Sequence, residues 1–287
     1  MIHPDKIVGK LIARNESTYR TEDTILYALG LGFGADPTDT DQLKFVYEQN
    51  IQTLPTMSLV LGYPGFWLKD PQYEVDWTKV LHAEEQLIVH SPLPPASAMI
   101  GETYVDDIVD RGADKGVFIY TRKEVRAESD GKLFATVYSN TLARGDGDCG
   151  GSSSANARPK PAPMPEREPD AICDLRTIPQ QALLYRLCGD MNPLHADPAI
   201  AAGAGFERPI LHGRATMGVA QHAILKTCCA YDPKRIKSMS LRFSAPFLPG
   251  EILRTEIWQD GDDVYFRSLA QERGVVVLNN GHVELNS

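Results

Sequence analysis

The chain has 287 residues, 43% of them hydrophobic, and a formal net charge of -9 at pH 7. A chain of this length buries one large core or two modest ones, and we expect two domains. The acidic balance argues against a general binder of nucleic-acid backbones, since such proteins usually carry a basic face. No stretch approaches the roughly eighteen apolar residues of a membrane-spanning helix, and no N-terminal segment resembles a secretory signal.

The sequence contains five cysteines, including the adjacent pair Cys228-Cys229, and no CxxC motif. This usage predicts free thiols and is typical of a reducing compartment. The last residues, Leu285 to Ser287, do not match the Ser-Lys-Leu signal for peroxisomes. We therefore expect a soluble protein of the cytoplasm.

One helix and a set of strands are predicted in the first half. Thr21 to Leu31 has apolar residues at helical spacing, with Thr21 as its cap and acidic residues in its first turn. Asp130-Gly131 predicts a tight turn between two strands. Segments rich in β-branched and aromatic residues, which favour strands, are 103–108, 116–127 and 132–142.

The second half is predicted to place a helix before another set of strands. Arg214 to Ala230 carries few charges and is apolar on most faces, so we expect a buried helix. Its small residues would let a curved sheet approach closely. Strands are predicted at 239–243, 252–258, 264–270 and 275–285.

The order of these elements indicates the α+β class, because helices precede antiparallel strands without strand–helix–strand alternation. Residues 144–170 are dense in glycine, serine, proline and charge, which is typical of a linker over the surface. We therefore expect an N-terminal unit at 1–143, a linker at 144–170 and a C-terminal unit at 171–287.

The densest group of reactive side chains lies between Tyr185 and Gly213. Pro193, between Asp190 and His195, discourages a helix from continuing through this point. Asp190 and His195 would then lie on the two limbs of a tight turn, where a carboxylate and an imidazole can share a water molecule for general acid–base chemistry. Gly213 precedes the apolar helix, and free N–H groups at a helix start favour an oxyanion.

This stretch resembles the hydratase 2 motif of the MaoC-like (R)-specific 2-enoyl-CoA hydratases. The resemblance implies that Asp190 and His195 activate water, that Asn192 helps to position the site, and that the Gly213 N–H binds the thioester oxygen. The matching residues are Tyr185, Leu187, Gly189-Asp190, Asn192-Pro193-Leu194-His195, Asp197-Pro198, Phe206 and Pro209-Ile210-Leu211-His212-Gly213.

The same resemblance implies a fold and a reaction. Leu54-Pro55-Thr56 and Val80 to Glu84 are similar to the N-terminal half of two-copy members, such as the hydratase unit of peroxisomal multifunctional enzyme type 2. A double hotdog fold is implied, with antiparallel sheets wrapped around a helix. The implied reaction is reversible hydration of trans-2-enoyl-CoA to (3R)-3-hydroxyacyl-CoA in fatty acid metabolism. It uses no cofactor, because coenzyme A is part of the substrate.

The two halves also match each other, as in a duplicated unit. Tyr27 to Gly32 falls on Tyr185 to Asp190, and Pro92 to Pro94 falls on 246–248 at nearly the same offset. Gly32 and Pro37 then stand where Asp190 and His195 do. The first copy is therefore predicted to be non-catalytic.

A candidate site for the acyl tail lies in the first half. Leu54 to Gly65 contains proline and glycine and is a poorer helix than its counterpart in the second half. A shortened helix would leave an apolar slot beside Met57, and each methylene that enters such a slot gains roughly 0.8 kcal/mol. We expect this half to accommodate the acyl chain and to favour a medium or long enoyl-CoA.

Four further residues are assigned to the substrate site, each with an alternative. Tyr185 is otherwise a packed core tyrosine, and His212 either orients the turn or donates a hydrogen bond. Glu84 matches a glutamate of two-copy relatives and is otherwise a structural ion-pair partner. Arg242, like Lys237, either meets the phosphates of coenzyme A or is simply solvated.

Simpler interpretations of the motif stay open. Asp190 and His195 alone would fit a helix cap and a turn histidine, and Asp197 is expected to cap a short helix. A metal held by His195, Asp197 and His212 is not expected, because their spacing matches no zinc motif.

Two rival functions remain beside the hydratase. A hotdog acyl-CoA thioesterase would direct water at the carbonyl carbon, and the Asn192 to His195 element argues against it. A non-catalytic acyl-CoA-binding protein would have no need to keep Asp190, His195 and Gly213. The expected partner is an acyl-CoA thioester, with neither nucleic acid nor membrane, and a homodimer is left open.

Overall fold

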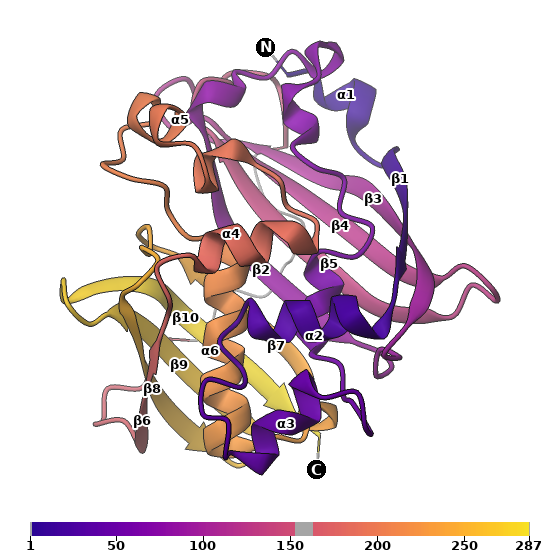
Figure 1. Cartoon of the computed structure of the whole chain (residues 1–287). Helices are drawn as coiled ribbons and strands as arrows, with labels where there is room; N and C mark the ends of the chain where they lie inside the picture. The colour runs from indigo at the N-terminus through magenta and orange to yellow at the C-terminus, as the bar shows by residue number, and fades with distance from the viewer. Residues whose placement is uncertain (1, 153–162, 287) are drawn as a thin grey trace.

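Ten strands form one antiparallel sheet that curves around a long helix. The structure, a computed structural model, describes residues 2–152 and 163–286. Neighbouring strands follow the order β1-β3-β4-β5-β2-β7-β10-β9-β8-β6 (Figure 1). The strands are β1 Leu11–Tyr19, β2 Val80–Val89, β3 Ser97–Asp110, β4 Val117–Ala127, β5 Leu133–Ala143, β6 Ala171–Arg176, β7 Ile236–Phe243, β8 Ile252–Asp260, β9 Asp263–Ala270 and β10 Val275–Leu285.

Helices are short except for one. The α-helices are α1 Pro4–Ile7, α2 Thr21–Leu29, α3 Thr40–Val46, α4 Gln181–Tyr185, α5 Pro198–Gly203 and α6 Gly213–Cys228. The 3-10 helices are η1 Pro55–Leu59, η2 Trp67–Lys69, η3 Pro71–Tyr73, η4 Trp77–Lys79, η5 Arg186–Cys188, η6 Pro193–His195 and η7 Pro233–Arg235. No helix within residues 2–152 and 163–286 reaches the length and apolarity that a bilayer crossing requires.

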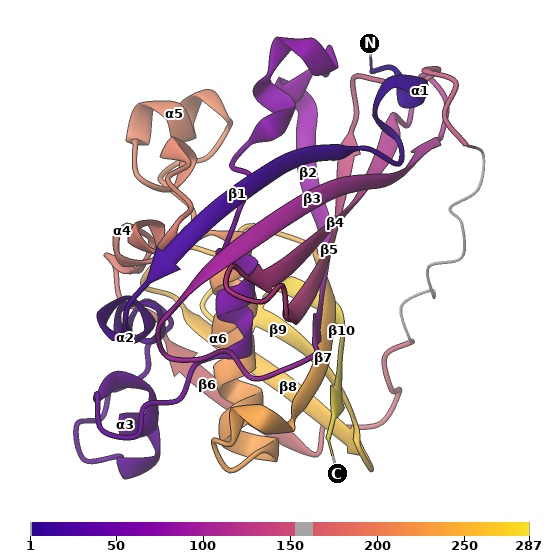
Figure 2. The ribbon, with the colours of Figure 1, turned by 90° about the vertical axis from the view of Figure 1, so that its right-hand side faces the viewer.

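The sheet consists of two halves that meet at one pair of strands. β1 to β5 come from the first half of the chain and β6 to β10 from the second, and β2 pairs with β7 from Glu84 opposite Arg242 to Ile88 opposite Ser238. Figure 2 shows the two halves one above the other, joined at these strands. The predicted strands and the α+β class are confirmed.

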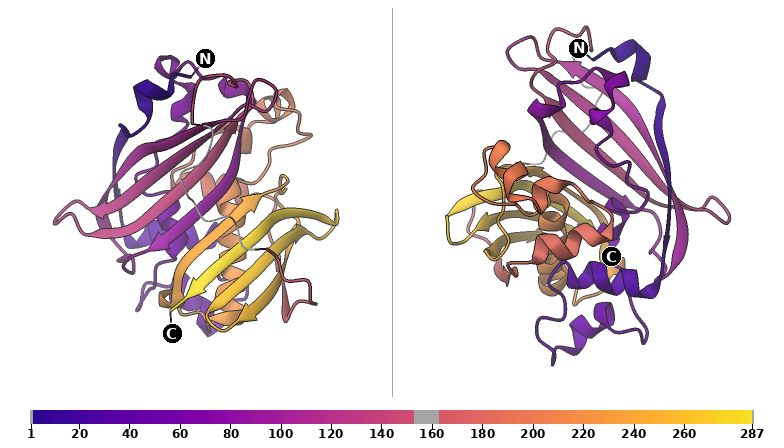
Figure 3. Two further views of the ribbon diagram at one scale, coloured as in Figure 1. Left: turned by 180° about the vertical axis from the view of Figure 1, so that it is seen from behind. Right: turned by 45° about the horizontal axis from the view of Figure 1, so that its top comes forward.

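α6 is the buried helix that the sequence predicts. Every residue from Ala215 to Leu225 is buried, and the strands cover one side of the helix, as the view from behind in Figure 3 shows. A Cβ on Gly218 would lie 2.6 Å from the end of the Leu31 side chain, so a larger residue here would require Leu31 to shift. The helix ends at Cys228 because Ala230 and Tyr231 have left-handed φ values of 48° and 57°.

α2 begins one residue earlier than the sequence suggests. The Asp23 carboxylate accepts a hydrogen bond from the N–H of Arg20 at 2.8 Å, and Arg20 is the N-cap residue. Thr21 is the first helical residue, so its prediction as the cap was wrong. The acid in the third helical position satisfies a free N–H before the helix, which removes the need for a hydroxyl cap.

The two stretches that match in sequence pack against each other in space. α2 and α4 lie side by side (Figures 1 and 2), and the Gln181 side chain donates to the carbonyl oxygen of Gly30 at 3.1 Å. The rings of Tyr27 and Tyr185 have centroids 5.7 Å apart. This pairing agrees with two copies of one unit.

The first half has only a short helix where the second has α6. η1 has five residues, all of them buried. A Cβ on Gly62 would lie 2.4 Å from the backbone of Gly101, so the segment after η1 rests directly on β3. The prediction of a shortened helix is confirmed.

The predicted linker is described only at its two ends. Residues 144–152 return to β3, where the N–H of Asp110 donates to the Ser152 carbonyl oxygen at 2.9 Å. At the other end the chain enters β6 at Ala171, which pairs with β8. Residues 153–162 of the predicted linker lie outside the described residues.

Candidate active site

A tight turn after α4 carries the predicted acid and base. Gly189 has a φ of 130°, which ends the helical run just before Asp190. The Asp190 carboxylate accepts the N–H of Asn192 at 3.2 Å, and the Asn192 side chain accepts the N–H of Leu194 at 3.1 Å. Asp190 and His195 therefore lie on the two limbs of the turn, as predicted, and Asn192 caps η6 between them.

His195 is held in a form that can accept a proton. It is 8% exposed, and its Nδ1 lies 2.8 Å from the carbonyl oxygen of Ile210. A carbonyl only accepts, so Nδ1 carries the hydrogen and Nε2 of the neutral ring keeps a free lone pair. Burial lowers the pKa of His195 below 6.5, while the nearby carboxylate of Asp190 acts in the opposite direction.

His212 supports this turn from the start of α6. Its ring stacks on His195 with centroids 3.7 Å apart, and its Nε2 donates to the Asp190 carbonyl oxygen at 3.0 Å. Burial, with His195 adding to it, lowers the pKa of His212 to about 3. His212 is therefore a neutral donor that fixes the backbone of Asp190, which combines the two roles considered for it.

If His195 acts as the predicted base, its protonation state sets a pH dependence that can be measured. Its base form persists below pH 6.5 because its pKa is lowered, so we expect kcat/KM for the 2-enoyl-CoA substrate that the resemblance implies to stay level from pH 8 to 6.5 and to fall only at lower pH. Initial rates of absorbance loss across this range measure the profile. An acidic limb centred above pH 6.5 would contradict a buried, neutral His195 as the base.

Gly213 lies at the helix start where the sequence predicts a donor for an oxyanion. It is the first residue of α6, so its N–H has no partner inside the helix. A Cβ at this position would lie 3.0 Å from the ring of Phe243, which leaves little room for a larger residue. The helix dipole adds positive potential at the same point.

Tyr185 and Met57 lie behind the site. Tyr185 is fully buried, and its ring centroid is 5.0 Å from that of His212, so it backs the histidine. Met57 is 3% exposed, and its sulfur accepts from the Thr24 hydroxyl at 3.8 Å. The apolar residues from which a slot for the acyl tail is expected are buried and belong to the main hydrophobic core: Leu54, Met57, Leu59, Val60 and Leu61.

Glu84 and Arg242 face each other across the junction of the two halves. They are opposite residues of β2 and β7, and their side chains form an ion pair at 3.2 Å. The other oxygen of Glu84 accepts from the Asn140 side chain at 3.0 Å. This geometry agrees with the interpretation of Glu84 as a structural ion-pair partner. The Arg242 side chain remains half exposed beside it.

Sequence reasoning missed a buried ion pair directly after Gly213. Arg214 donates from Nε and Nη2 to one oxygen of Glu85 at 3.2 and 3.0 Å, and it lies 4.5 Å over the ring of Tyr63. His82 contacts the other oxygen of Glu85 and packs its ring against Phe243. A charge at the start of an apolar helix and two adjacent acids in a strand were the available signals.

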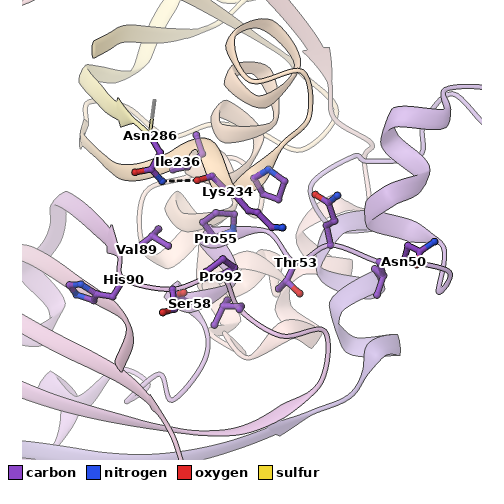
Figure 4. Close-up of a pocket in the computed structure, with 15 residues that line it drawn as sticks. Asn50, Thr53, Pro55, Ser58, Val89, His90, Pro92, Lys234, Ile236 and Asn286 are labelled. Carbon is purple, nitrogen blue, oxygen red and sulfur yellow. Dashed lines mark hydrogen bonds between the residues drawn. The ribbon is translucent and has the colours of Figure 1, made fainter. Parts of the chain in front are cut away.

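A separate pocket lies at the other end of the junction. Its volume is about 460 Å³, and it is lined by residues of η1, of the end of β2 and the segment after it, of η7 and of the start of β7, among them Ser58, His90 and Lys234 (Figure 4). None of the motif residues lines it. Among the described residues, no three His, Cys, Asp or Glu side chains gather closely enough to hold a metal ion.

Comparison with known proteins identifies the family of the chain. The model of the MFE-2 hydratase 2 N-terminal domain matches residues 17–145, and that of the MaoC-like domain matches residues 160–280. A relative from Arabidopsis thaliana, named enoyl-CoA hydratase 2, peroxisomal, is 36% identical over 98% of this chain and 94% of its own length. The chain belongs to the MaoC-like hydratase 2 family.

Other similar proteins include a larger multifunctional enzyme and a solved structure with the same fold. Peroxisomal multifunctional enzyme type 2 from Mus musculus is 34% identical over 97% of this chain, which spans only 38% of that protein. The crystal structure of a MaoC-like dehydratase from Phytophthora capsici matches with a TM-score of 0.86 and 32% identity, over 99% of this chain and 98% of that one.

One similar structure is described by the name of its fold. A Mycobacterium tuberculosis protein described as a double hotdog matches with a TM-score of 0.59 at 13% identity, over 96% of this chain and 98% of that one. At that identity the likeness concerns the fold alone. The predicted double hotdog fold is confirmed.

Proposed function

We propose that this chain hydrates trans-2-enoyl-CoA thioesters reversibly to (3R)-3-hydroxyacyl-CoA in fatty acid metabolism, with water activated between Asp190 and His195. The enzyme is a lyase of the hydratase 2 type. The observation that carries the assignment is the free Nε2 of His195, set in the same turn as the Asp190 carboxylate. The names of the relatives, enoyl-CoA hydratase 2 and 3-hydroxyacyl-thioester dehydratase Y, support the reaction class.

The proposed reaction has two steps. The acid–base pair takes a proton from the bound water while its oxygen forms a bond to C3 of the enoyl group, and the C2–C3 double bond shifts to an enolate. The proton held by the pair then moves to C2, and the carbonyl is restored. No proton or electron is gained or lost overall, so no external reactant besides water is needed.

Gly213 stabilises the charge that develops on the thioester oxygen. Its N–H at the start of α6 has no helical partner, so it is available to the enolate oxygen. His212 serves this arrangement indirectly, because its hydrogen bond to the Asp190 carbonyl keeps the turn against the helix start. Asn192 does so by capping η6.

The proposal includes a division of labour between the halves. The first half accommodates the acyl chain and is non-catalytic, since Gly32 and Pro37 stand where the second half has its acid and base. Support comes from contacts of the first half with the site: Tyr63 packs on Arg214, and a Cβ on Gly189 would lie 3.4 Å from the Val60 carbonyl oxygen.

The remaining parts of the proposal concern location and assembly. We place the protein in the cytoplasm, which its five free cysteines support. It uses no cofactor beyond the coenzyme A of its substrate. Arg242 contacts that coenzyme A in this proposal, supported by its half-exposed position beside Glu84, and a homodimer is left open.

Removing the imidazole tests the acid–base pair. We expect His195→Gln to lower kcat for crotonyl-CoA by roughly a hundredfold to ten-thousandfold, because glutamine has no titratable nitrogen. Combining it with Asp190→Asn should cost little more than either change alone, since the two residues act on one water. His282→Gln is the matched control, because His282 pairs with Asp263 on β10 and β9. Additive losses in the double variant would contradict a shared water.

A further inference from the structure

A pseudo-twofold axis relates the two halves of the chain, and it passes between the paired strands β2 and β7. The sequence match of 92–94 with 246–248 also sets Gln86 on Ser240, and these two residues face each other in the sheet. The pairs on either side obey the same relation, so the end of β2 corresponds to the end of β7. A site at one end of this junction therefore has a counterpart at the other end.

The pocket at the other end of the junction is the counterpart of the candidate active site. In the second half, Gly213 begins α6 and lies against Phe243, the last residue of β7. In the first half, Pro55 begins η1, and Val89 is the last residue of β2. Pro55 and Val89 both line the pocket of about 460 Å³. The fold thus places this pocket where a second active site would stand.

The pocket lacks the groups that the candidate active site needs. Pro55 has no N–H, so it offers no donor for an oxyanion at the position that corresponds to Gly213. Gly32 and Pro37 stand where the second half has its acid and base. A ligand that enters this pocket is therefore bound and not converted.

The charge of the pocket differs from that of the chain as a whole. The chain carries 38 acidic against 29 basic residues, yet no described aspartate or glutamate lines the pocket. Lys234 and His90 do line it, and the Lys234 side chain extends into it near Pro55 and Thr53 (Figure 4). Within the part of the chain that the structure describes, no carboxylate forms an ion pair with the Lys234 ammonium. The pocket therefore favours an anion.

Apolar side chains from both halves form another part of the lining, and they leave room for an aliphatic chain. They include Ile51, Val89, Leu93 and Ile236. At about 30 Å³ for each water of the liquid, the volume equals that of roughly fifteen waters, which suits a ligand of about ten non-hydrogen atoms. A single lysine beside apolar walls matches a monocarboxylate better than a phosphate, whose second charge calls for more donors.

We propose that this pocket is a second, non-catalytic site that binds an aliphatic monocarboxylate of about eight carbons. The carboxylate pairs with the Lys234 ammonium, and the chain lies against Val89, Leu93 and Ile236. The proposal goes beyond the proposed hydratase function and does not depend on it. Because Lys234 is exposed and the ligand is small, we expect a Kd on the order of 0.1–1 mM.

Binding of octanoate to the purified protein is the first test, measured by isothermal titration calorimetry. Octanamide has the same shape without the charge and should bind about fivefold more weakly. Acetate has the charge without the chain and should bind at least about tenfold more weakly. Absence of octanoate binding up to about 10 mM, equal binding of octanamide, or displacement of octanoate by an equal concentration of inorganic phosphate would overturn the proposal.

A charge variant then locates the bound carboxylate. Lys234→Met keeps the length of the side chain and removes its charge, so it should weaken octanoate binding about fivefold. It should leave kcat/KM for crotonyl-CoA unchanged, because the pocket lies at the far end of the junction from Gly213. Lys237→Met is the matched control and should leave octanoate binding unchanged, since Lys237 already pairs with Glu284.

A second variant tests the space for the chain. Ser91 lines the pocket and is partly exposed, so Ser91→Trp should fold and fill the pocket, and it should abolish octanoate binding. Saturating coenzyme A should not displace octanoate from the wild type. Unchanged octanoate affinity in folded Lys234→Met or folded Ser91→Trp, or displacement by coenzyme A, would place the ligand elsewhere and overturn the proposal.

Discussion

Replacing Asp190 by asparagine should lower kcat for crotonyl-CoA by roughly a thousandfold or more while the fold stays intact. The amide has the shape of the carboxylate, and its oxygen can still accept the N–H of Asn192, which holds the turn. It cannot take a proton from water, so the pair loses one of its two acid–base members. Single-turnover and steady-state rates, with circular dichroism of the folded protein, measure both parts of this expectation.

A second aspartate in the same stretch provides the control. Asp197 caps α5 by accepting the N–H groups of Ala199 and Ile200 at 2.8 and 3.4 Å, and these hydrogen bonds direct its carboxylate to the start of α5. Asp197→Asn should therefore retain nearly all of the activity. If Asp190→Asn kept more than about a tenth of the wild-type kcat, Asp190 would not be an acid–base residue.

Arg214→Met should lower the free energy of unfolding by roughly 3–5 kcal/mol, because it leaves the carboxylate of Glu85 buried without its cation. Glu85 is 1% exposed. Burial opposes its ionisation, yet Arg214 and His82 together lower its pKa to about 2. Urea unfolding at pH 7 measures the loss.

The same ion pair predicts how stability changes with acid. The pKa of Glu85 is lower in the folded chain than its usual 4.5, so its contribution is complete above pH 4.5 and is lost as the pH falls toward 2. Arg214→Met should remove this pH-dependent contribution along with the stability at pH 7.

The double variant Glu85→Gln with Arg214→Met distinguishes the loss of the ion-pair contact from the cost of leaving one buried charge without a partner. Removing both charges leaves no buried ion without a partner, so the double variant should recover most of the stability lost in Arg214→Met. A loss below about 1 kcal/mol in the single variant would be the value of an exposed ion pair and would contradict a buried one.

Much of the fold follows from local pattern in the sequence. The buried helix α6 is visible because eleven consecutive residues, Ala215 to Leu225, include few charges and all pack inside the sheet. The tight turn at Asp190 is visible because Gly189 and Pro193 each end helical structure for a known reason. The turn that carries Asp190 and His195 and the helix start at Gly213 could therefore be predicted from local pattern, whereas the roles of these residues came from the family resemblance and stay a prediction.

Other features depend on contacts between distant residues and could not be predicted. Lys123 occupies an inward position of β4 only because three carbonyls near η1, more than sixty residues earlier, accept from it. The N-cap residue of α2 is Arg20 and not Thr21, because the Asp23 carboxylate accepts the N–H of Arg20. The sequence predicted only that Asp23 would favour the first turn. The Arg214–Glu85 pair likewise joins the two halves of the chain.

The stereochemical product of crotonyl-CoA hydration tests the central claim most directly. Purified enzyme is incubated with crotonyl-CoA, and the 3-hydroxybutyryl-CoA formed is resolved by chiral chromatography while free coenzyme A is followed with a thiol reagent. Water held between Asp190 and His195, with the thioester oxygen at Gly213, predicts the (3R) product and no release of coenzyme A. Formation of the (3S) product, or release of coenzyme A in place of hydration, would contradict the account.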